Sequence, residues 1–120
     1  MFLFNYDYQT YKKLVIPDVN KMEIVELSDI VYIDYDDDIT IIHLINDKQI
    51  YTTQTLKDLK ESLRQYGFYQ IDKGCIINIR YVTEINSKNK NCFIKLNNIE
   101  KKVSRRKQKE MKELFNSALL

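Results

Sequence analysis

The stretch IVYIDYDDDITIIHLINDKQIYTT, residues 30–53, decides the fold. It contains three runs rich in β-branched and aromatic side chains, which favour strands. Short polar segments separate the runs, and acidic or amide side chains there compete with their own backbone and favour turns. The predicted strands are Ile30–Tyr35, Ile39–Ile45 and Lys48–Thr53, with turns at Asp36–Asp38 and Asn46–Asp47. Such a meander of hairpins implies an antiparallel sheet.

The segment before this stretch contains two further strand patterns. Tyr11–Ile16 is a short β-prone run that ends at Pro17, because proline cannot donate a hydrogen bond to a sheet. Met22–Leu27 alternates between two faces, as a strand does. Aromatic residues alternate through residues 1–10, which fits either an extra strand or a loosely attached tail. We therefore treat residues 1–10 as an N-terminal extension and residues 11–120 as one domain.

A helix is predicted directly after the meander. Thr55 is a typical N-cap residue, and Asp58 stands three residues later, in the position of a capping box. Three leucines repeat at helical spacing and form one apolar stripe: Leu56, Leu59 and Leu63. Gly67 can adopt the left-handed conformation that ends a helix.

The rest of the chain returns to strand patterns and ends in a second helix. The predicted strands are Phe68–Ile71, Cys75–Ile79, Tyr81–Ile85, Cys92–Leu96 and Ile99–Val103. Polar turns are predicted at Asn86–Asn91 and Asn97–Asn98. A terminal helix is predicted from Ser104, with an apolar face formed by Met111, Leu114, Phe115 and Ala118. The predicted fold class is mainly β, with one principal helix and a C-terminal helix.

The composition fits one cytosolic domain. Apolar residues make up 44% of the 120 residues, enough for a packed core. No apolar run approaches the ~18 residues of a membrane-spanning helix, and the first residues do not read as a signal peptide. Cys75 and Cys92 lie in short apolar segments, so we interpret them as buried thiols and not as a disulfide or a metal site.

Catalytic and metal-binding patterns are weak. His43 is the single histidine of the chain and lies inside a predicted strand, where it is interpreted as a packed side chain. Cys and His ligands are too few for a zinc site. The acidic triplet Asp36–Asp38 lacks the spaced ligands and the glycine of a calcium loop, and two glycines cannot supply a phosphate-binding loop. We predict no enzymatic activity, no metal and no cofactor.

Charge is divided unequally along the chain. Residues 1–66 hold 7 basic and 12 acidic side chains, and residues 67–120 hold 12 and 5, so the two parts carry net charges of −5 and +7. Between Lys101 and Lys112, seven basic residues accompany one acidic residue, and Ser104 stands among them. Cations, a hydroxyl and the free amides of a helix start together suit a backbone phosphate. Taken alone, such a charge run favours a solvated surface.

Four segments, in this order, resemble the LytTR family of DNA-binding domains. Asp29–Ile33 is similar to the family's Asp-Ile-x-Tyr-Ile strand, and the helix capped by Thr55 is similar to its helix. Phe68–Asn78 resembles the family signature, in which a phenylalanine leads into a polar stretch and then an apolar run that ends in asparagine. Val103–Lys107 resembles the closing Val-Ser-Arg-Arg element. The match runs from about Tyr11 to the C-terminus.

The resemblance implies an elongated arrangement of small antiparallel β-sheets that binds DNA through loops and not through a recognition helix. Domains of this family usually stand at the C-terminus of bacterial response regulators and bind promoter repeats in the cytoplasm. The implied partner is therefore double-stranded DNA, and the implied function is transcription regulation. The resemblance also leaves room for a homodimer on tandem sites and for a receiver domain or partner regulator.

The same resemblance assigns roles to individual positions. Lys73 and Arg106 match the positions that read bases, and both side chains can reach the acceptors of guanine. The positions that match phosphate contacts are Thr55, Lys57, Ser104, Lys107 and Lys109. Lys101, Lys102 and Arg105, from the basic stretch, complete the predicted phosphate-binding set.

The chain departs from the family pattern at two acidic places. Gln70, Asp72 and Gly74 stand where the family tends to have Arg, His and Ser. Asp72 therefore places a negative charge beside Lys73. Asp36–Asp38 is acidic where a loop that faces DNA would favour basic or neutral residues. These departures support an alternative, a LytTR-like interaction or regulatory module with weak DNA binding.

Overall fold

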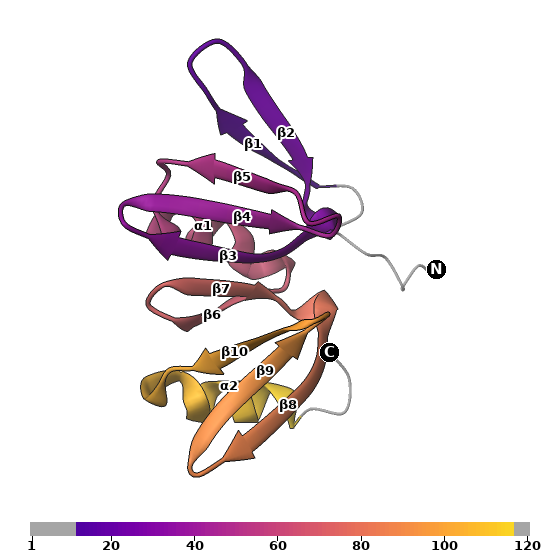
Figure 1. Cartoon of the computed structure of the whole chain (residues 1–120), viewed down its shortest axis with the longest axis vertical. Helices are drawn as coiled ribbons and strands as arrows, with labels where there is room; N and C mark the ends of the chain where they lie inside the picture. Colours follow the sequence, from indigo (N-terminus) through magenta and orange to yellow (C-terminus); the bar gives the residue numbers. More distant parts are fainter. Residues whose placement is uncertain (1–11, 117–120) are drawn as a thin grey trace.

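The computed structural model describes residues 12–116. Its strands form three antiparallel sheets, which confirms the predicted fold class (Figure 1). The first sheet pairs β1 (Lys13–Pro17) with β2 (Met22–Glu26). The five-stranded sheet contains, in spatial order, β5 (Gln49–Thr52), β4 (Ile39–Leu44), β3 (Ile30–Asp36), β7 (Cys75–Asn78) and β6 (Phe68–Asp72). The three-stranded sheet has the order β10 (Ile99–Val103), β9 (Asn91–Leu96) and β8 (Val82–Lys88).

Two helices and the alternation of the strands divide the core into two clusters. Successive side chains of a strand point to opposite faces, so the central sheet contributes to both clusters. On one face, α1 (Leu56–Leu63) packs against buried isoleucines such as Ile33 and Ile76. On the other face, Tyr32 and Ile77 pack with the three-stranded sheet and with Met111 of α2 (Gln108–Phe115). The central sheet therefore lies between α1 and the C-terminal unit.

The predicted cap and stop of α1 are confirmed. The Thr55 Oγ1 atom accepts a hydrogen bond from the Asp58 amide at 3.1 Å, and all three leucines of the apolar stripe are buried. A 3₁₀ turn at Arg64–Tyr66 follows, and Gly67 ends it with a φ of 88°. The cap at Thr55 therefore fixes the start of α1 shortly after the end of β5.

Two hairpin tips have non-glycine residues in the left-handed conformation at both central positions. The β3–β4 tip has Asp37 and Asp38 at φ values of 51° and 66°, and the β8–β9 tip has Asn89 and Lys90 at 51° and 68°. A positive φ at both central residues matches the right-handed twist of the flanking strands. The tips are therefore tight two-residue turns.

Two predictions at the C-terminal end are wrong. Residues 86–88 continue β8 and are not part of a turn, because β8 is an edge strand, where polar side chains can face water. Ser104 does not start an α-helix: it is extended, with φ −62° and ψ 151°, and its amide donates to the Ile71 carbonyl at 2.8 Å. A 3₁₀ turn at Arg105–Lys107 follows, and α2 begins at Gln108.

The thiols are buried, as predicted. Cys75 and Cys92 are both free, and burial raises the pKa of Cys75 to about 12. Tyr11, Ala118 and the extension at residues 1–10 lie outside the described residues, so the predictions on them stay predictions. Within residues 12–116, no helix is long and apolar enough to cross a membrane.

Candidate nucleic-acid interface

Five connections lie along one edge of the molecule. From top to bottom of the left side of Figure 1, they are the β5–α1, β3–β4, β6–β7, β10–α2 and β8–β9 connections. The β4–β5 and β9–β10 turns lie on the opposite side. Most of the residues predicted to contact DNA stand on this edge, because they follow or precede strands that end there.

The β6–β7 turn presents Lys73. The Lys73 side chain is exposed, and the Gly74 amide donates to Asp72 Oδ2 at 3.3 Å. Asp72 is therefore partly engaged by the backbone of its own turn, so its carboxylate stabilises the turn that carries Lys73. The neighbouring strand is joined here as well, because the Tyr35 amide donates to the Gly74 carbonyl at 2.9 Å.

The β10–α2 connection presents Arg106 next to this turn. Arg105 and Arg106 are both exposed on the 3₁₀ turn. The hydrogen bond from the Ser104 amide to the Ile71 carbonyl joins β10 to β6. Ile71 stands two residues before Lys73, and Ser104 stands two residues before Arg106. The structure therefore brings the two predicted base-reading positions onto adjacent connections.

A hollow of about 330 Å³ lies between these connections. It is lined by Asp72, Asn91, Lys102, Ser104, Arg105 and Gln108. Lys102 is exposed, and the Ser104 hydroxyl makes no capping hydrogen bond with the turn that follows. A hydroxyl, a lysine and an arginine thus line one hollow, together with the Asp72 carboxylate. The first three are groups that suit a phosphate oxygen.

The remaining residues predicted to contact phosphate differ in whether their side chains already have a partner in the protein. Lys57 and Lys109 are exposed, whereas the Lys107 ammonium lies 3.5 Å from Glu110 Oε1. A surface pair of this kind contributes little to stability, so a phosphate can compete for Lys107. The Thr55 hydroxyl already accepts from the Asp58 amide. A phosphate at the start of α1 would therefore depend on Lys57 and on the free backbone amides.

Lys101 is placed apart from this set. Its ammonium lies 3.2 Å from both carboxylate oxygens of Asp34 and 4.7 Å from the centre of the Tyr32 ring. Although burial alone would lower it, the Asp34 carboxylate holds the pKa of Lys101 above its ordinary value. Lys101 is thus engaged inside the protein, a contact between residues 67 positions apart that sequence reasoning missed.

Sequence reasoning also missed part of the edge and left another part unplaced. Lys88, Asn89 and Lys90 are exposed on the β8–β9 tip, next to Asn91 in the hollow, and the surplus of positive charge after residue 66 was the available signal. The acidic tip at Asp36–Asp38 is also exposed at this edge, beside the turn that carries Lys73. The edge therefore combines a basic C-terminal part with one acidic tip.

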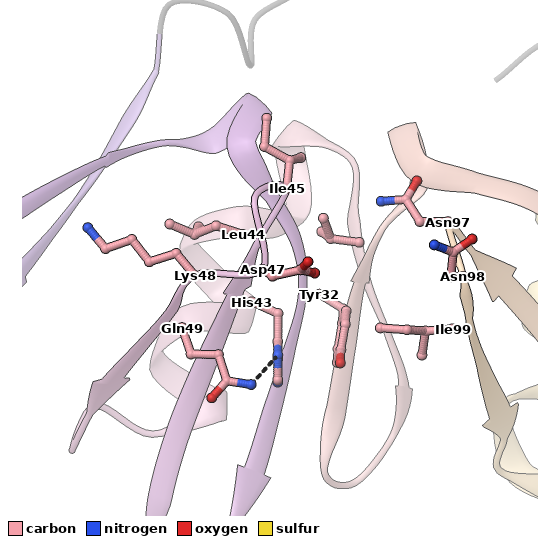
Figure 2. A pocket seen from close by; sticks show the side chains of 11 residues that line it. Tyr32, His43, Leu44, Ile45, Asp47, Lys48, Gln49, Asn97, Asn98 and Ile99 are labelled. Atoms are coloured by element: carbon pink, nitrogen blue, oxygen red, sulfur yellow. Dashed lines mark hydrogen bonds between the residues drawn. The ribbon is translucent and has the colours of Figure 1, made fainter.

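A larger pocket, of about 540 Å³, lies on the opposite side (Figure 2). It is lined on one side by residues around the β4–β5 turn, including Asp47 and Lys48, and on the other by Asn97 and Asn98 of the β9–β10 turn. None of the positions predicted to contact DNA lines this pocket. It contributes no group to the edge described above.

Comparison with known proteins identifies the family. The model of the LytTr DNA-binding domain family matches residues 20–116. The chain belongs to the LytTR family. Among solved structures, this LytTR domain is similar to the LytTr DNA-binding domain of a protein described as a methyl-accepting/DNA response regulator from Bacillus cereus. The TM-score is 0.74 at 14% sequence identity, over 86% of this chain and 95% of that chain.

At 14% identity the structural likeness supports the fold alone, and the family match carries the assignment. A search of curated proteins gave no match. LytTR domains are DNA-binding domains of transcription regulators and are not a family of enzymes. The predicted family, fold and general partner are therefore confirmed, and the roles of individual residues remain to be argued.

Proposed function

We propose that this LytTR domain binds double-stranded DNA sequence-specifically at promoter sites in a bacterial cytoplasm, with its β6–β7 and β10–α2 connections in the major groove. The observation that carries the proposal is the Ser104–Ile71 backbone hydrogen bond. It joins two connections that each expose a cation suited to guanine at the predicted base-reading position. Two loops at a fixed spacing can read two groups of bases in register.

Roles divide between base reading and phosphate contact. Arg106 offers bidentate hydrogen bonds to guanine, and Lys73 offers a single ammonium. Phosphate contacts set the position of the domain but carry no sequence information. The proposed phosphate contacts are Thr55, Lys57, Lys88, Lys90, Lys102, Ser104, Arg105, Lys107 and Lys109. The start of α1 enters this set through its free amides.

The acidic tip sets a limit on the footprint. Asp36–Asp38 repels phosphate at the β3–β4 tip of this edge. We therefore expect the C-terminal part of the domain to hold most of the DNA backbone. Two copies would occupy tandem repeats, and a receiver domain or a partner regulator would control them.

The first test is base preference. Selection from a random duplex library with the wild-type protein should recover a defined site. In fluorescence anisotropy, Arg106→Ala should lose about 1–3 kcal/mol on that site and lose preference at one base position. Lys107→Ala should weaken the selected and a scrambled duplex by similar factors. Equal preference in wild type and Arg106→Ala would reject the assigned role of Arg106.

A second candidate function is an interaction module with weak DNA binding. The acidic tip beside Lys73 favours it, because it opposes phosphate on the edge that would face DNA. Retention on duplex DNA at moderate salt separates the two functions. A domain that elutes from a duplex column as early as from an uncharged column would be an interaction module.

A further inference from the structure

An ion pair joins the two sheets that carry the base-reading connections. Lys101, on β10 of the three-stranded sheet, places its ammonium 3.2 Å from both carboxylate oxygens of Asp34, on β3 of the central sheet. Both side chains are about one quarter exposed. The same ammonium lies over the Tyr32 ring at 4.7 Å, which adds a cation–π contact. The pair is therefore partly desolvated and held from two directions.

Further contacts hold Asp34 in place. His43 Nε2 lies 3.3 Å from Asp34 Oδ2, and the His43 ring is stacked on Tyr32 at a centroid distance of 4.0 Å and an angle of 10°. Figure 2 shows the two rings side by side, with the Gln49 amide 3.4 Å from His43 Nδ1. The Asp34 carboxylate thus has a fixed orientation, as a positioning group requires.

The pair joins strands that neighbour or lead into the two base-reading connections. On the central sheet, Asp34 is paired with Cys75, two residues after Lys73. On the three-stranded sheet, Lys101 precedes Arg106 by five residues. The backbone hydrogen bond between Ser104 and Ile71 also joins the two sheets here. The buried cluster around Tyr32 and Ile77 packs the two sheets together, and the ion pair adds a polar contact that starts from a different strand of the central sheet.

We propose that Asp34 and Lys101 are positioning residues that fix the spacing between the Lys73 and Arg106 connections, and that Lys101 does not bind phosphate. This inference rests on the proposed function, because spacing matters only where two loops read one DNA site. It replaces the role that the basic stretch assigned to Lys101. Specificity for the selected site, and not general attraction to DNA, is the property that depends on the pair.

A phosphate role and a positioning role for Lys101 predict opposite results for Asp34. If Lys101 bound phosphate, Asp34→Asn would release its ammonium and strengthen binding to any duplex. If the pair sets the spacing, Asp34→Asn weakens binding to the selected site and leaves a scrambled duplex unaffected. The salt dependence separates the two roles again, because each lost phosphate contact reduces the slope of log K against log salt by about 0.9.

The experiment compares Asp34→Asn, Lys101→Met, their combination and Lys101→Arg, with fluorescein-labelled selected and scrambled duplexes of equal length. We expect about a tenfold loss on the selected duplex for either single variant, a value within the range of one base contact. The salt slope and the affinity for the scrambled duplex should stay at wild-type values. The double variant should lose no more than the single variants, and Lys101→Arg should retain wild-type specificity.

The matched control is Lys102→Met. Lys102 is the next residue of β10, is exposed and lines the hollow beside Ser104. The Lys102→Met variant should reduce the slope of log K against log salt by about 0.9 and bind both duplexes more weakly by similar factors. The inference is overturned if Lys101→Met behaves like Lys102→Met, or if Asp34→Asn and Lys101→Met both bind as wild type does.

Two further readouts separate a failed inference from a failed function or a failed fold. A wild-type protein that prefers no selected site would refute the proposed function before any variant is made. Circular dichroism and thermal melts establish that each variant is folded at the assay temperature. If Asp34→Asn is unfolded there, Lys101→Met and Asp34→Glu carry the test, because the extra methylene of glutamate displaces the carboxylate. Wild-type specificity in both variants overturns the inference.

Discussion

Asn78 connects the signature segment to the rest of the fold. It is fully buried, its Nδ2 donates to the Ile30 carbonyl at 2.8 Å, and its Oδ1 accepts from the Arg80 amide at 3.0 Å. The carboxamide therefore satisfies backbone groups on both sides of the end of β7. An asparagine at the end of an apolar run has a physical reason here, because a buried carbonyl without a partner is costly.

We expect Asn78→Ala to lower the free energy of unfolding by about 2–3 kcal/mol, since it leaves buried backbone groups without partners and creates a small cavity. Urea denaturation monitored by circular dichroism measures the loss. Asn98→Ala, at an exposed turn position, is the control and should change the free energy by less than about 0.5 kcal/mol. A loss for Asn78→Ala no larger than that of the control would contradict this account.

At the scale of elements, the start of α1 combines a structural and a functional role. The hydroxyl of Thr55 accepts from the Asp58 amide, and the remaining amides of the first turn are proposed to face phosphate. Thr55→Ala should therefore destabilise the domain by about 0.5–2 kcal/mol, and Thr55→Ser should retain most of the stability. Thermal denaturation of both variants tests this expectation, and equal melting temperatures for the two would contradict it.

The elements themselves could largely be predicted, because alternation and caps are local signals. The meander around Asp36–Asp38 and the helix after Thr55 follow from side chains within a few residues of each other. The sequence pattern of residues 86–88 predicts a turn, although they belong to β8. An edge strand tolerates polar side chains on both faces, and this hides the alternation. Ser104 was placed at a helix start because its bond to Ile71 depends on a strand 33 residues earlier.

The candidate site could be predicted only in part. Positions such as Arg106 and Lys73 stand on exposed connections, which turn residues and charge indicate. The engagement of Lys101 could not be predicted, because a lysine within a basic stretch gives no sign of a carboxylate on another sheet. Which turns share one edge likewise follows from the order of strands in space, and sequence alternation does not contain that order.

At the scale of the whole molecule, the Asp34–Lys101 pair links stability to pH. Burial opposes ionisation of Asp34, but the neighbouring His43 imidazole and the Lys101 ammonium together hold the pKa of Asp34 below its ordinary value. A carboxyl group with a lowered pKa in the folded state stabilises the fold above its unfolded-state pKa of about 3.9. That stabilisation is lost as the pH falls through the folded-state pKa of Asp34.

We therefore expect wild type to exceed Asp34→Asn in unfolding free energy by about 1–3 kcal/mol between pH 5 and pH 8. The difference should shrink below about pH 4, where the carboxyl group becomes protonated. The pKa of Lys101 is raised in the folded state, so its pH dependence is opposite to that of Asp34. The stabilisation from Lys101 is present below about pH 10.4 and is lost as the pH rises further. Urea titrations at pH 7, 5, 4 and 3 test the acid limb, and a difference that is as large at pH 3 as at pH 7 would contradict it.

At the left-handed hairpin tips, the requirements of stability and of DNA binding oppose each other. Lys90 carries a full side chain at a φ of 68°, where an L-residue is strained and glycine is not. We expect Lys90→Gly to raise the free energy of unfolding by about 0.5–1 kcal/mol while it weakens DNA binding. Lys90→Ala, measured in the same melts and titrations, should lose the affinity without the gain in stability.

Selection for stability alone would thus favour loss of the cation from the β8–β9 tip. Retention of Lys90 has a conformational cost that the melts can measure. The same holds at the acidic tip, where Asp37 and Asp38 occupy positions that glycine would fill with less strain. The chain has only two glycines, and these tips carry charged side chains at positions where glycine would fit with less strain.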